Sequence, residues 1–203
     1  MRLPLILFLL AAVLPVFFGK VRSAPMWLCL QAIALGWNGV AHQESLSGHA
    51  FVVLVEVIAV RAVIVPTLLR RAIRLRAEPN LDLMPSNLFA WAIGIALIVL
   101  AFEFGGSALA DVGALALGVV GAMVAIALLL LSTNDSPPAQ LVALLYMENA
   151  IAVFESLLPE PWPLPVHGAL TLVYLVTVGV GSWLIGSPGP RAADATPAHG
   201  EAS

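Results

Sequence analysis

Long apolar segments recur along almost the whole chain, and they constrain its fold more than any other feature. Seven of them are found, at approximately residues 3–19, 24–41, 49–69, 86–104, 108–131, 139–158 and 165–186. Most have the length of about 17–25 residues that a helix needs to cross a lipid bilayer. Because backbone groups in hydrocarbon must satisfy their own hydrogen bonds, each segment is predicted to be a helix.

The composition supports the same fold class. Hydrophobic residues make up 61% of the 203 residues and charged residues 10%, whereas a soluble domain has about 25% charged residues. We therefore predict an all-α, polytopic transmembrane helix bundle of about seven spans over residues 1–186. Residues 187–203 are rich in Pro, Ala and Gly, and we expect them to form a disordered cytoplasmic tail. The first segment is longer than a signal-peptide core and precedes Lys20 and Arg22, so we expect it to be retained.

The basic residues predict an orientation. In a seven-span topology almost all of them lie on one side, in the first link, the third link and the tail. They are Lys20, Arg22, Arg70, Arg71, Arg74, Arg76 and Arg191. Since Lys and Arg accumulate in cytoplasmic links, the N-terminus is expected outside and the C-terminus in the cytoplasm. The four arginines of the third link, residues 70–76, are also candidates for docking to anionic lipid headgroups or to a cytoplasmic partner.

Ionisable residues inside two apolar segments are the main functional signal. Arg61 lies near the middle of segment 49–69, and Glu148 near the middle of segment 139–158. On the outer side of these, Glu56 and Glu155 are displaced by about 7.5 Å and about 10.5 Å along their helices. A charge at the bilayer centre costs roughly 2.5–3.5 kcal/mol on insertion scales, so such residues usually line ion or proton paths. If the two helices are neighbours, these four residues form a proton-relay ladder; the alternative is a buried pair that only fixes helix packing.

Other chemistry is sparse in the sequence. His167 heads the last segment and can titrate near neutral pH, and Tyr174 follows within it, but that segment has no acidic residue. We find no nucleophile–base pair, phosphate-binding loop, cofactor motif or metal-ligand set, so no catalytic residue, bound cofactor, metal or nucleic acid is expected. The small residues Ala114, Gly118 and Ala122 recur every four positions, a spacing that lets two helices approach closely in lipid.

Three stretches resemble a known family. The stretch "GHAFVVLVEVIAVRAVIVPTLLRRAIRL" (48–75) resembles the basic, proline and double-arginine region of the E-type membrane subunit of hydrogenase 4 and related formate-hydrogenlyase complexes. The stretch "QLVALLYMENAIAVF" (140–154) resembles the glutamate–asparagine segment of that family, and is similar to the central-glutamate helix of the K subunit of respiratory complex I. The stretch "MWLCLQAIALGW" (26–37), with Gln31, fits the second helix of the family.

The resemblance implies a non-catalytic, multi-pass subunit in the membrane arm of a redox complex of the bacterial plasma (inner) membrane. The implied partners are antiporter-like membrane subunits and a soluble arm that carries the nickel–iron and iron–sulfur centres, with electron transfer coupled to proton or sodium movement. Glu148 matches the central glutamate of the family. Arg61 stands where lysine is expected of relatives, and the last segment lacks the expected acidic residues.

Two other functions remain open at this stage. Seven helices with a central charge pair also suit a small stand-alone ion transporter or channel. A membrane anchor or assembly subunit that docks through Arg70, Arg71, Arg74 and Arg76 is the third possibility.

Overall fold

The computed structural model describes residues 2–41, 48–75, 81–84, 87–106, 111–158 and 162–187. Within these ranges the chain folds into helices joined by short connections, with one isolated β-bridge between Lys20 and Asp82. The elements are α1 (Leu3–Phe18), η1 (Val21–Ser23, a 3-10 turn), α2 (Ala24–Ala41), α3 (Gly48–Glu56), η2 (Val57–Ile64, a π-helix), α4 (Val65–Leu75), α5 (Leu88–Gly105), α6 (Val112–Thr133), α7 (Pro137–Glu155) and α8 (Leu164–Gly186). The prediction of an all-α chain is confirmed. The predicted tail lies outside the described residues beyond Ser187.

Local sequence signals explain where several helices begin. Asn87 precedes α5, and its Oδ1 accepts a hydrogen bond from the Ala90 N–H at 2.6 Å. Asp111 precedes α6, and its Oδ2 accepts from the Ala114 N–H at 3.0 Å. Such N-caps satisfy backbone donors that have no partner inside the helix. Hydrogen bonds from the backbone N–H groups of Ala114 and Gly113 hold the pKa of the Asp111 carboxyl below its usual value.

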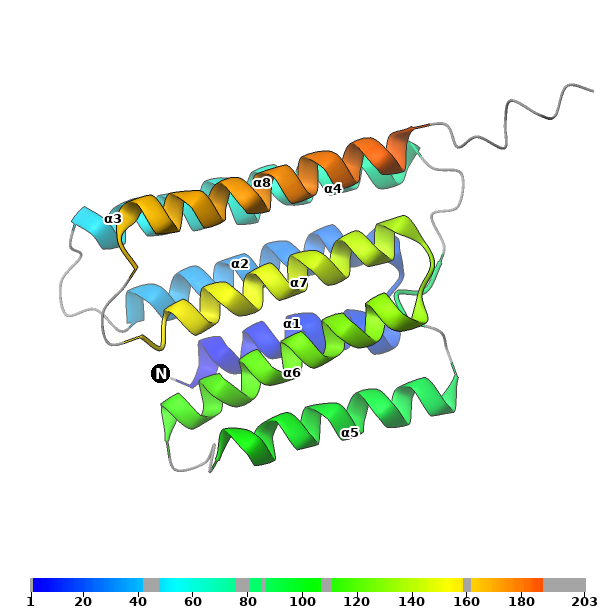
Figure 1. Ribbon diagram of the computed structural model, residues 1–203, viewed down its shortest axis with the longest axis horizontal. Coiled ribbons are helices and arrows are strands. Elements are labelled where there is room, and N and C mark those ends of the chain that lie inside the picture. The colour runs from blue at the N-terminus through cyan, green and yellow to red at the C-terminus, as the bar shows by residue number, and fades with distance from the viewer. Residues whose placement is uncertain are drawn as a thin grey trace, which may run out of the picture.

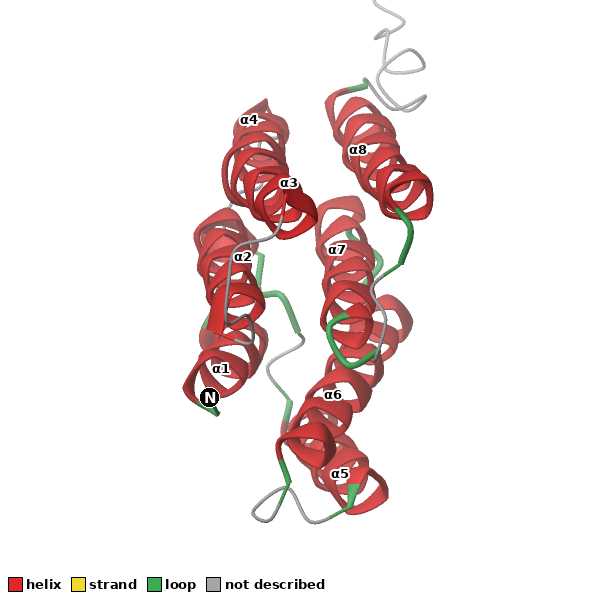
Figure 2. Ribbon diagram, turned by 90° about the vertical axis from the view of Figure 1, so that its left-hand side faces the viewer, coloured by secondary structure: helices red, strands yellow, loops and turns green. Residues whose placement is uncertain are grey.

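The helices stand in two rows (Figures 1 and 2). One row contains α1, α2 and the continuous helix α3–η2–α4, and the other contains α5, α6, α7 and α8. Helices that follow one another in each row pack closely, as α1 does on α2, α5 on α6 and α6 on α7. The contact between α4 and α8 joins the rows at one edge, and the contact between α1 and α6 joins them further along. Both rows contribute to one hydrophobic core.

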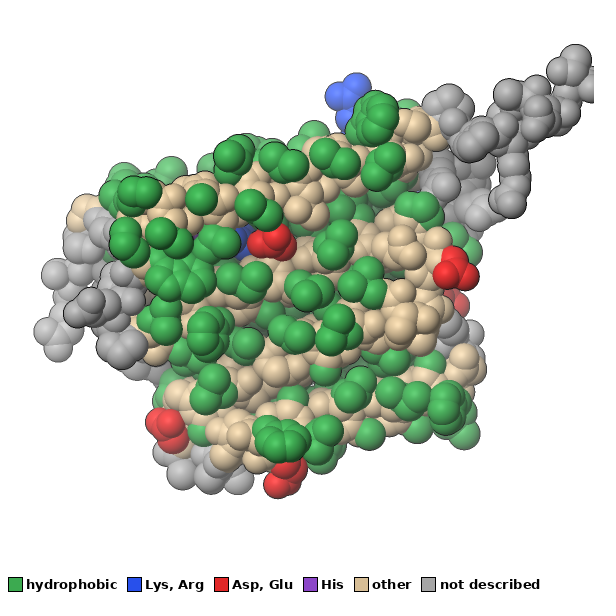
Figure 3. All heavy atoms as spheres, viewed as in Figure 1, with side chains coloured by type: hydrophobic (Ala, Val, Ile, Leu, Met, Phe, Trp, Pro, Cys, Tyr) green, Lys and Arg blue, Asp and Glu red, His purple; other side chains and the backbone are tan. Residues whose placement is uncertain are grey.

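Four helical stretches of the described chain are long and apolar enough to cross a membrane: Ala50–Leu75, Leu88–Gly105, Val112–Thr133 and Leu164–Gly186. A shorter apolar helix, Leu3–Phe18, packs beside them. Many large hydrophobic side chains face outward, including Phe89 and Phe104, and hydrophobic atoms dominate the face drawn in Figure 3. This suits a protein surrounded by lipid rather than water. The count of seven spans and the orientation of the termini stay predictions.

The third apolar segment is longer than the sequence suggested. We expected a span over residues 49–69 followed by a polar link, but the helix continues to Leu75. Leu69, Ala72 and Ile73 are buried, and their spacing of three and four places them on one face of α4. Arg70, Arg71 and Arg74 therefore lie on the exposed face of a helix and not in a loop, whereas Arg76 lies outside the described residues.

The small-residue stripe of α6 packs against α5. The position of a Cβ at Gly118 is occupied by the ring of Phe102, and a Cβ at Gly121 would stand 3.2 Å from the Cβ of Ala101. A Cβ at Gly105 would stand 2.9 Å from the backbone nitrogen of Gly118. The close approach that the sequence predicted is confirmed, and its partner is α5.

One end of the bundle is rich in basic residues. The α1–α2 connection, the last turns of α4 and the end of α8 lie together at this end (Figure 1). Among the described residues, its exposed basic side chains are those of Lys20, Arg22, Arg70, Arg71 and Arg74. We call it the basic end. The opposite end holds the start of α1, the end of α7 and the start of α8.

Candidate functional site: a buried polar row

A connected set of polar side chains crosses the core between the two rows of helices. We call it the polar row, and it consists of Gln31, Asn149, Arg61, Glu56, His167 and Glu155. They come from α2, α3, η2, α7 and α8. Buried polar groups in an apolar interior are costly unless they are paired, so the contacts within this row decide whether it is stable.

Arg61 is the centre of the polar row and is only 4% exposed. Its Nη1 donates a hydrogen bond to Asn149 Oδ1 at 3.0 Å and approaches the Glu148 main-chain oxygen at 3.5 Å. Its Nε lies 3.6 Å from Glu56 Oε1. The guanidinium carbon also stands 4.4 Å from the ring centroid of Tyr174, a cation–π distance. A charge that cannot be removed by deprotonation is thus surrounded by acceptors.

The π-helical segment explains how Arg61 reaches Glu56. In an α-helix two residues five positions apart point about 140° away from each other. Hydrogen bonding from i to i+5 widens the turn and brings such residues toward the same face. Pro66, just after the π-segment, has no N–H to donate to the preceding turn. The π-helical backbone therefore allows Glu56 and Arg61, which are five residues apart, to pair through their side chains.

Two buried amides connect Arg61 to the second helix. Asn149 is 1% exposed and Gln31 is fully buried. Asn149 Nδ2 donates to Gln31 Oε1 at 2.9 Å, while its oxygen accepts from Arg61. The Asn149 side chain therefore uses both of its ends, and its orientation is fixed by two neighbours from the opposite row of helices.

His167 extends the polar row toward the end opposite the basic end. Its Nδ1 lies 3.2 Å from both carboxylate oxygens of Glu155, and its Nε2 lies 3.4 Å from Glu56 Oε2. The ring is 7% exposed and belongs to the first turn of α8, where the His167 N–H bonds to the Pro163 carbonyl at 3.1 Å. An imidazole held between two carboxylates can accept a proton from one and release it to the other.

Glu148 is placed differently from the sequence expectation. We expected its carboxylate to face the Arg61 guanidinium, but Arg61 meets its main-chain carbonyl and the side chain of the next residue, Asn149. The Glu148 side chain is partly exposed. Figure 3 shows acidic atoms beside a basic group in the middle of an otherwise hydrophobic face, over the boundary between α7 and α8.

The remaining sequence candidates divide into two groups. Glu56, Arg61, Glu155 and His167 lie in the polar row, with Tyr174 against Arg61. Arg70, Arg71 and Arg74 belong to the last turns of α4, which lie away from the polar row at the basic end (Figure 1). Sequence reasoning assigned no role to Gln31 and Asn149, because it searched the apolar segments for charged residues and these amides are neutral. The signal that could have found them is an amide in the middle of an apolar segment.

Several buried atoms of the site make no hydrogen bond within the described chain. They are Gln31 Nε2, both carboxylate oxygens of Glu56, Arg61 Nε, His167 Nε2 and the hydroxyl of Tyr174, whose ring lies against Arg61. Glu56 nevertheless lies at ion-pair distance from Arg61 and His167. The carboxylate thus has free acceptor capacity between a fixed cation and an imidazole. Among the described residues no group of three or more His, Cys, Asp or Glu side chains is arranged to hold a metal ion.

The polar row reaches one end of the bundle only. From the level of Arg61 it runs to Glu155, the last residue of α7, next to Ser156 and its contact with Asn38 at 3.3 Å. Toward the basic end the buried side chains of the same helices are mostly apolar. They include Leu28, Val65, Leu69, Leu141 and Leu145.

No protein-family model, curated protein or solved structure matches the chain. The fold and the site therefore define its class. It is an all-helical protein with at least four helices suited to crossing a membrane, and its core carries a connected row of charged and amide side chains.

Proposed function

We propose that this chain is a multi-pass membrane subunit that moves protons along the polar row as part of a larger redox complex, of the hydrogenase-4-like or complex-I-like kind. The observation that carries the proposal is the contact series Arg61–Glu56–His167–Glu155, with separations of 3.2–3.6 Å between charged groups. In this proposal all seven apolar segments span the membrane, with the N-terminus outside and the C-terminus in the cytoplasm.

The balance of charge supports a role for mobile protons. Glu56, Glu155 and the nearby Glu148 can contribute three negative charges, and Arg61 contributes one permanent positive charge. A cluster in a low-dielectric interior is strongly disfavoured when its net charge departs from zero. With three carboxylates beside one permanent cation, the cluster has more acidic groups than its fixed positive charge can balance, and bound protons can make up the difference. A proton relay requires donor and acceptor groups that lie close together, and the groups of the contact series are 3.2–3.6 Å apart.

The one-sided extent of the polar row favours a subunit over a stand-alone transporter. A carrier that works alone must connect its site to both faces of the membrane, whereas the described core is mostly apolar between Arg61 and the basic end. The partly exposed Glu148 side chain lies at the same level as Arg61, on the side of the bundle. A carboxylate facing lipid is unfavourable, so a neighbouring subunit that covers Glu148 would both shield it and continue the path.

The principal test is Glu56→Gln, which keeps the shape of the side chain and removes its charge. The tagged chain is purified in mild detergent from its own cells, and the co-purified subunits are identified by mass spectrometry. The assembly is then reconstituted into vesicles, and redox turnover and proton uptake are measured together. Glu103→Gln is the matched control, because Glu103 is exposed on α5, away from the polar row.

We expect Glu56→Gln to assemble normally and to lose most proton uptake per electron, while Glu103→Gln behaves as wild type. Unchanged proton uptake in assembled Glu56→Gln complexes would refute the relay and leave a scaffold role. Purification of a homo-oligomer without redox subunits, active in ion transport, would support the stand-alone transporter instead.

An anchoring role has one observation of its own. Arg70, Arg71 and Arg74 are exposed on α4 at the basic end, where they can bind an acidic partner. In an assembly subunit, charge reversal at these three positions should abolish assembly of the complex. Glu56→Gln should then leave proton uptake unchanged.

A further inference from the structure

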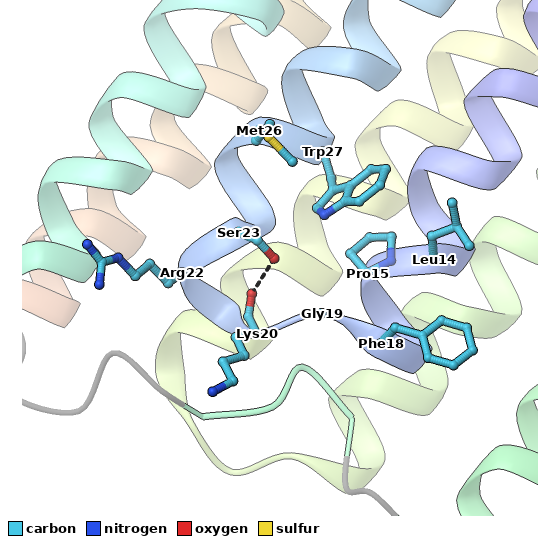
Figure 4. A pocket seen from close by; sticks show the side chains of 9 residues that line it. All are labelled: Leu14, Pro15, Phe18, Gly19, Lys20, Arg22, Ser23, Met26 and Trp27. Atoms are coloured by element: carbon cyan, nitrogen blue, oxygen red, sulfur yellow. Dashed lines mark hydrogen bonds between the residues drawn. The ribbon is translucent and has the colours of Figure 1, made fainter.

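A pocket of about 660 Å³ lies at the basic end, between the last turn of α1 and the first turn of α2. This volume is within the range of about 300–1,000 Å³ usual for small-molecule sites. Its walls are apolar and come from Leu14, Pro15, Phe18, Met26 and Trp27. Figure 4 shows the Trp27 indole beside Pro15 and Leu14, with Phe18 on the same side of the α1–α2 connection.

The walls are suited to a hydrocarbon chain and not to a water-soluble ligand. Phe18 is 76% exposed and Met26 58% exposed, so the pocket opens sideways onto the surface that the membrane helices share. Trp27 lies in the first turn of α2, and tryptophan is enriched where a membrane protein crosses the headgroup level. In lipid, the groove between α1 and α2 would be filled by acyl chains.

The edge of the same pocket is positively charged. Lys20, Arg22 and Ser23 complete its lining. Both basic side chains are exposed, and Figure 4 shows them extending away from the apolar walls in different directions, Lys20 from the α1–α2 connection and Arg22 from the η1 turn just before α2. The edge is held in place by the backbone, because the Val21 N–H donates to the Leu81 carbonyl at 2.9 Å and Ser23 Oγ donates to the Lys20 carbonyl at 2.8 Å. The positive end of the α2 dipole also lies here, and it favours a bound anion.

We propose that this pocket binds an anionic phospholipid, with an acyl chain against Phe18, Met26 and Trp27 and the phosphate held at the pocket edge by the flexible Lys20 and Arg22 side chains. An apolar groove and two basic residues of its lining occur together here, at the level where helices end. A soluble phosphate would gain nothing from the apolar walls, and a zwitterionic lipid would gain less from the two cations. This site is independent of the polar row and of the proposed relay.

The test uses the fluorescence of Trp27, because brominated acyl chains quench indole on close contact. The full chain is reconstituted into phosphatidylcholine vesicles that contain equal fractions of either brominated phosphatidylglycerol or brominated phosphatidylcholine. The chain has five tryptophans, so the Trp27 contribution is taken as the difference between wild type and Trp27→Phe. We expect brominated phosphatidylglycerol to quench Trp27 at a several-fold lower mole fraction than brominated phosphatidylcholine.

The Lys20→Gln/Arg22→Gln variant should weaken phosphatidylglycerol binding by about fivefold for each charge removed. Arg70→Gln/Arg71→Gln is the matched control, since it removes two exposed charges from the same end of the bundle, and it should leave Trp27 quenching unchanged. Equal quenching of wild-type Trp27 by the two lipids would overturn the proposal without any variant. Displacement of the lipid by millimolar inorganic phosphate, or equal loss in both double variants, would also overturn it.

Discussion

Replacing Asn149 by leucine tests whether the polar row holds the two rows of helices together. Asn149 is 1% exposed and bonds to Arg61 at 3.0 Å and to Gln31 at 2.9 Å. A hydrogen bond to a charged group contributes roughly 1.5–3 kcal/mol, and a neutral one between membrane helices about 0.6 kcal/mol. Asn149→Leu should therefore lower the free energy of unfolding by roughly 2–4 kcal/mol, because Arg61 and Gln31 keep their burial and lose their partner.

The assay is unfolding of the purified chain in mixed micelles, by titration with a denaturing detergent. Gln140→Leu is the matched control on α7, since Gln140 Nε2 makes only a 3.3 Å contact to the Asn134 carbonyl near the helix start, and it should change stability by less than about 0.5 kcal/mol. Asn149→Asp keeps an acceptor toward Arg61 and should lose less than Asn149→Leu. If Asn149→Leu is as stable as the Gln140→Leu control, the row does not hold the helices together.

Three further outcomes are expected. Gly118→Val on α6 should destabilise the chain by about 1–3 kcal/mol, because the new side chain collides with Phe102. Gly179→Ala is the control, because its Cβ position is open space, and it should not destabilise the chain. Thermal unfolding in detergent distinguishes the two variants. The capping carboxylate of Asp111 has a lowered pKa, so its contribution to stability should be complete above about pH 5 and disappear as the pH falls below about 4; in Asp111→Asn that pH dependence should be missing from the same thermal scans. Arg61→Lys should cost roughly 1.5 kcal/mol or more, because an ammonium cannot reproduce the forked contacts of a guanidinium, and an unchanged unfolding midpoint would contradict this.

The sequence predicted the helices better than their ends. Apolar length alone located every long helix, because hydrocarbon requires a self-satisfied backbone. It misplaced the end of the third helix, since Arg70, Arg71 and Arg74 were counted as a polar link. These three arginines are compatible with a helix, because they lie on its exposed face while Leu69, Ala72 and Ile73 are buried on the other face. Arginine is a good helix former, so a run of arginines does not by itself end a helix.

From the sequence we proposed four of the six members of the polar row, but we proposed neither the two amides nor the pairing. The relay hypothesis assumed that the helices carrying Arg61 and Glu148 are neighbours, and the guanidinium does approach the Glu148 carbonyl at 3.5 Å. The actual side-chain partners are Asn149 and Glu56. Helical spacing assumes 3.6 residues per turn, and a π-helical segment changes which residues share a face. Apart from Pro66, which follows the π-helical segment, no feature that we recognised in the sequence indicated that segment.

The last helix shows why counting acidic residues per helix is a poor guide to a proton path. Segment 165–186 has none, so a count of acidic residues would leave this helix out of a proton path. In the fold, His167 of α8 lies between Glu155 of α7 and Glu56 of α3, at 3.2 and 3.4 Å. A relay needs neighbouring donors and acceptors, and these can be supplied by any helix that reaches the same point. The absence of acids from α8 is therefore compatible with a continuous path, because its imidazole joins carboxylates that the other helices provide.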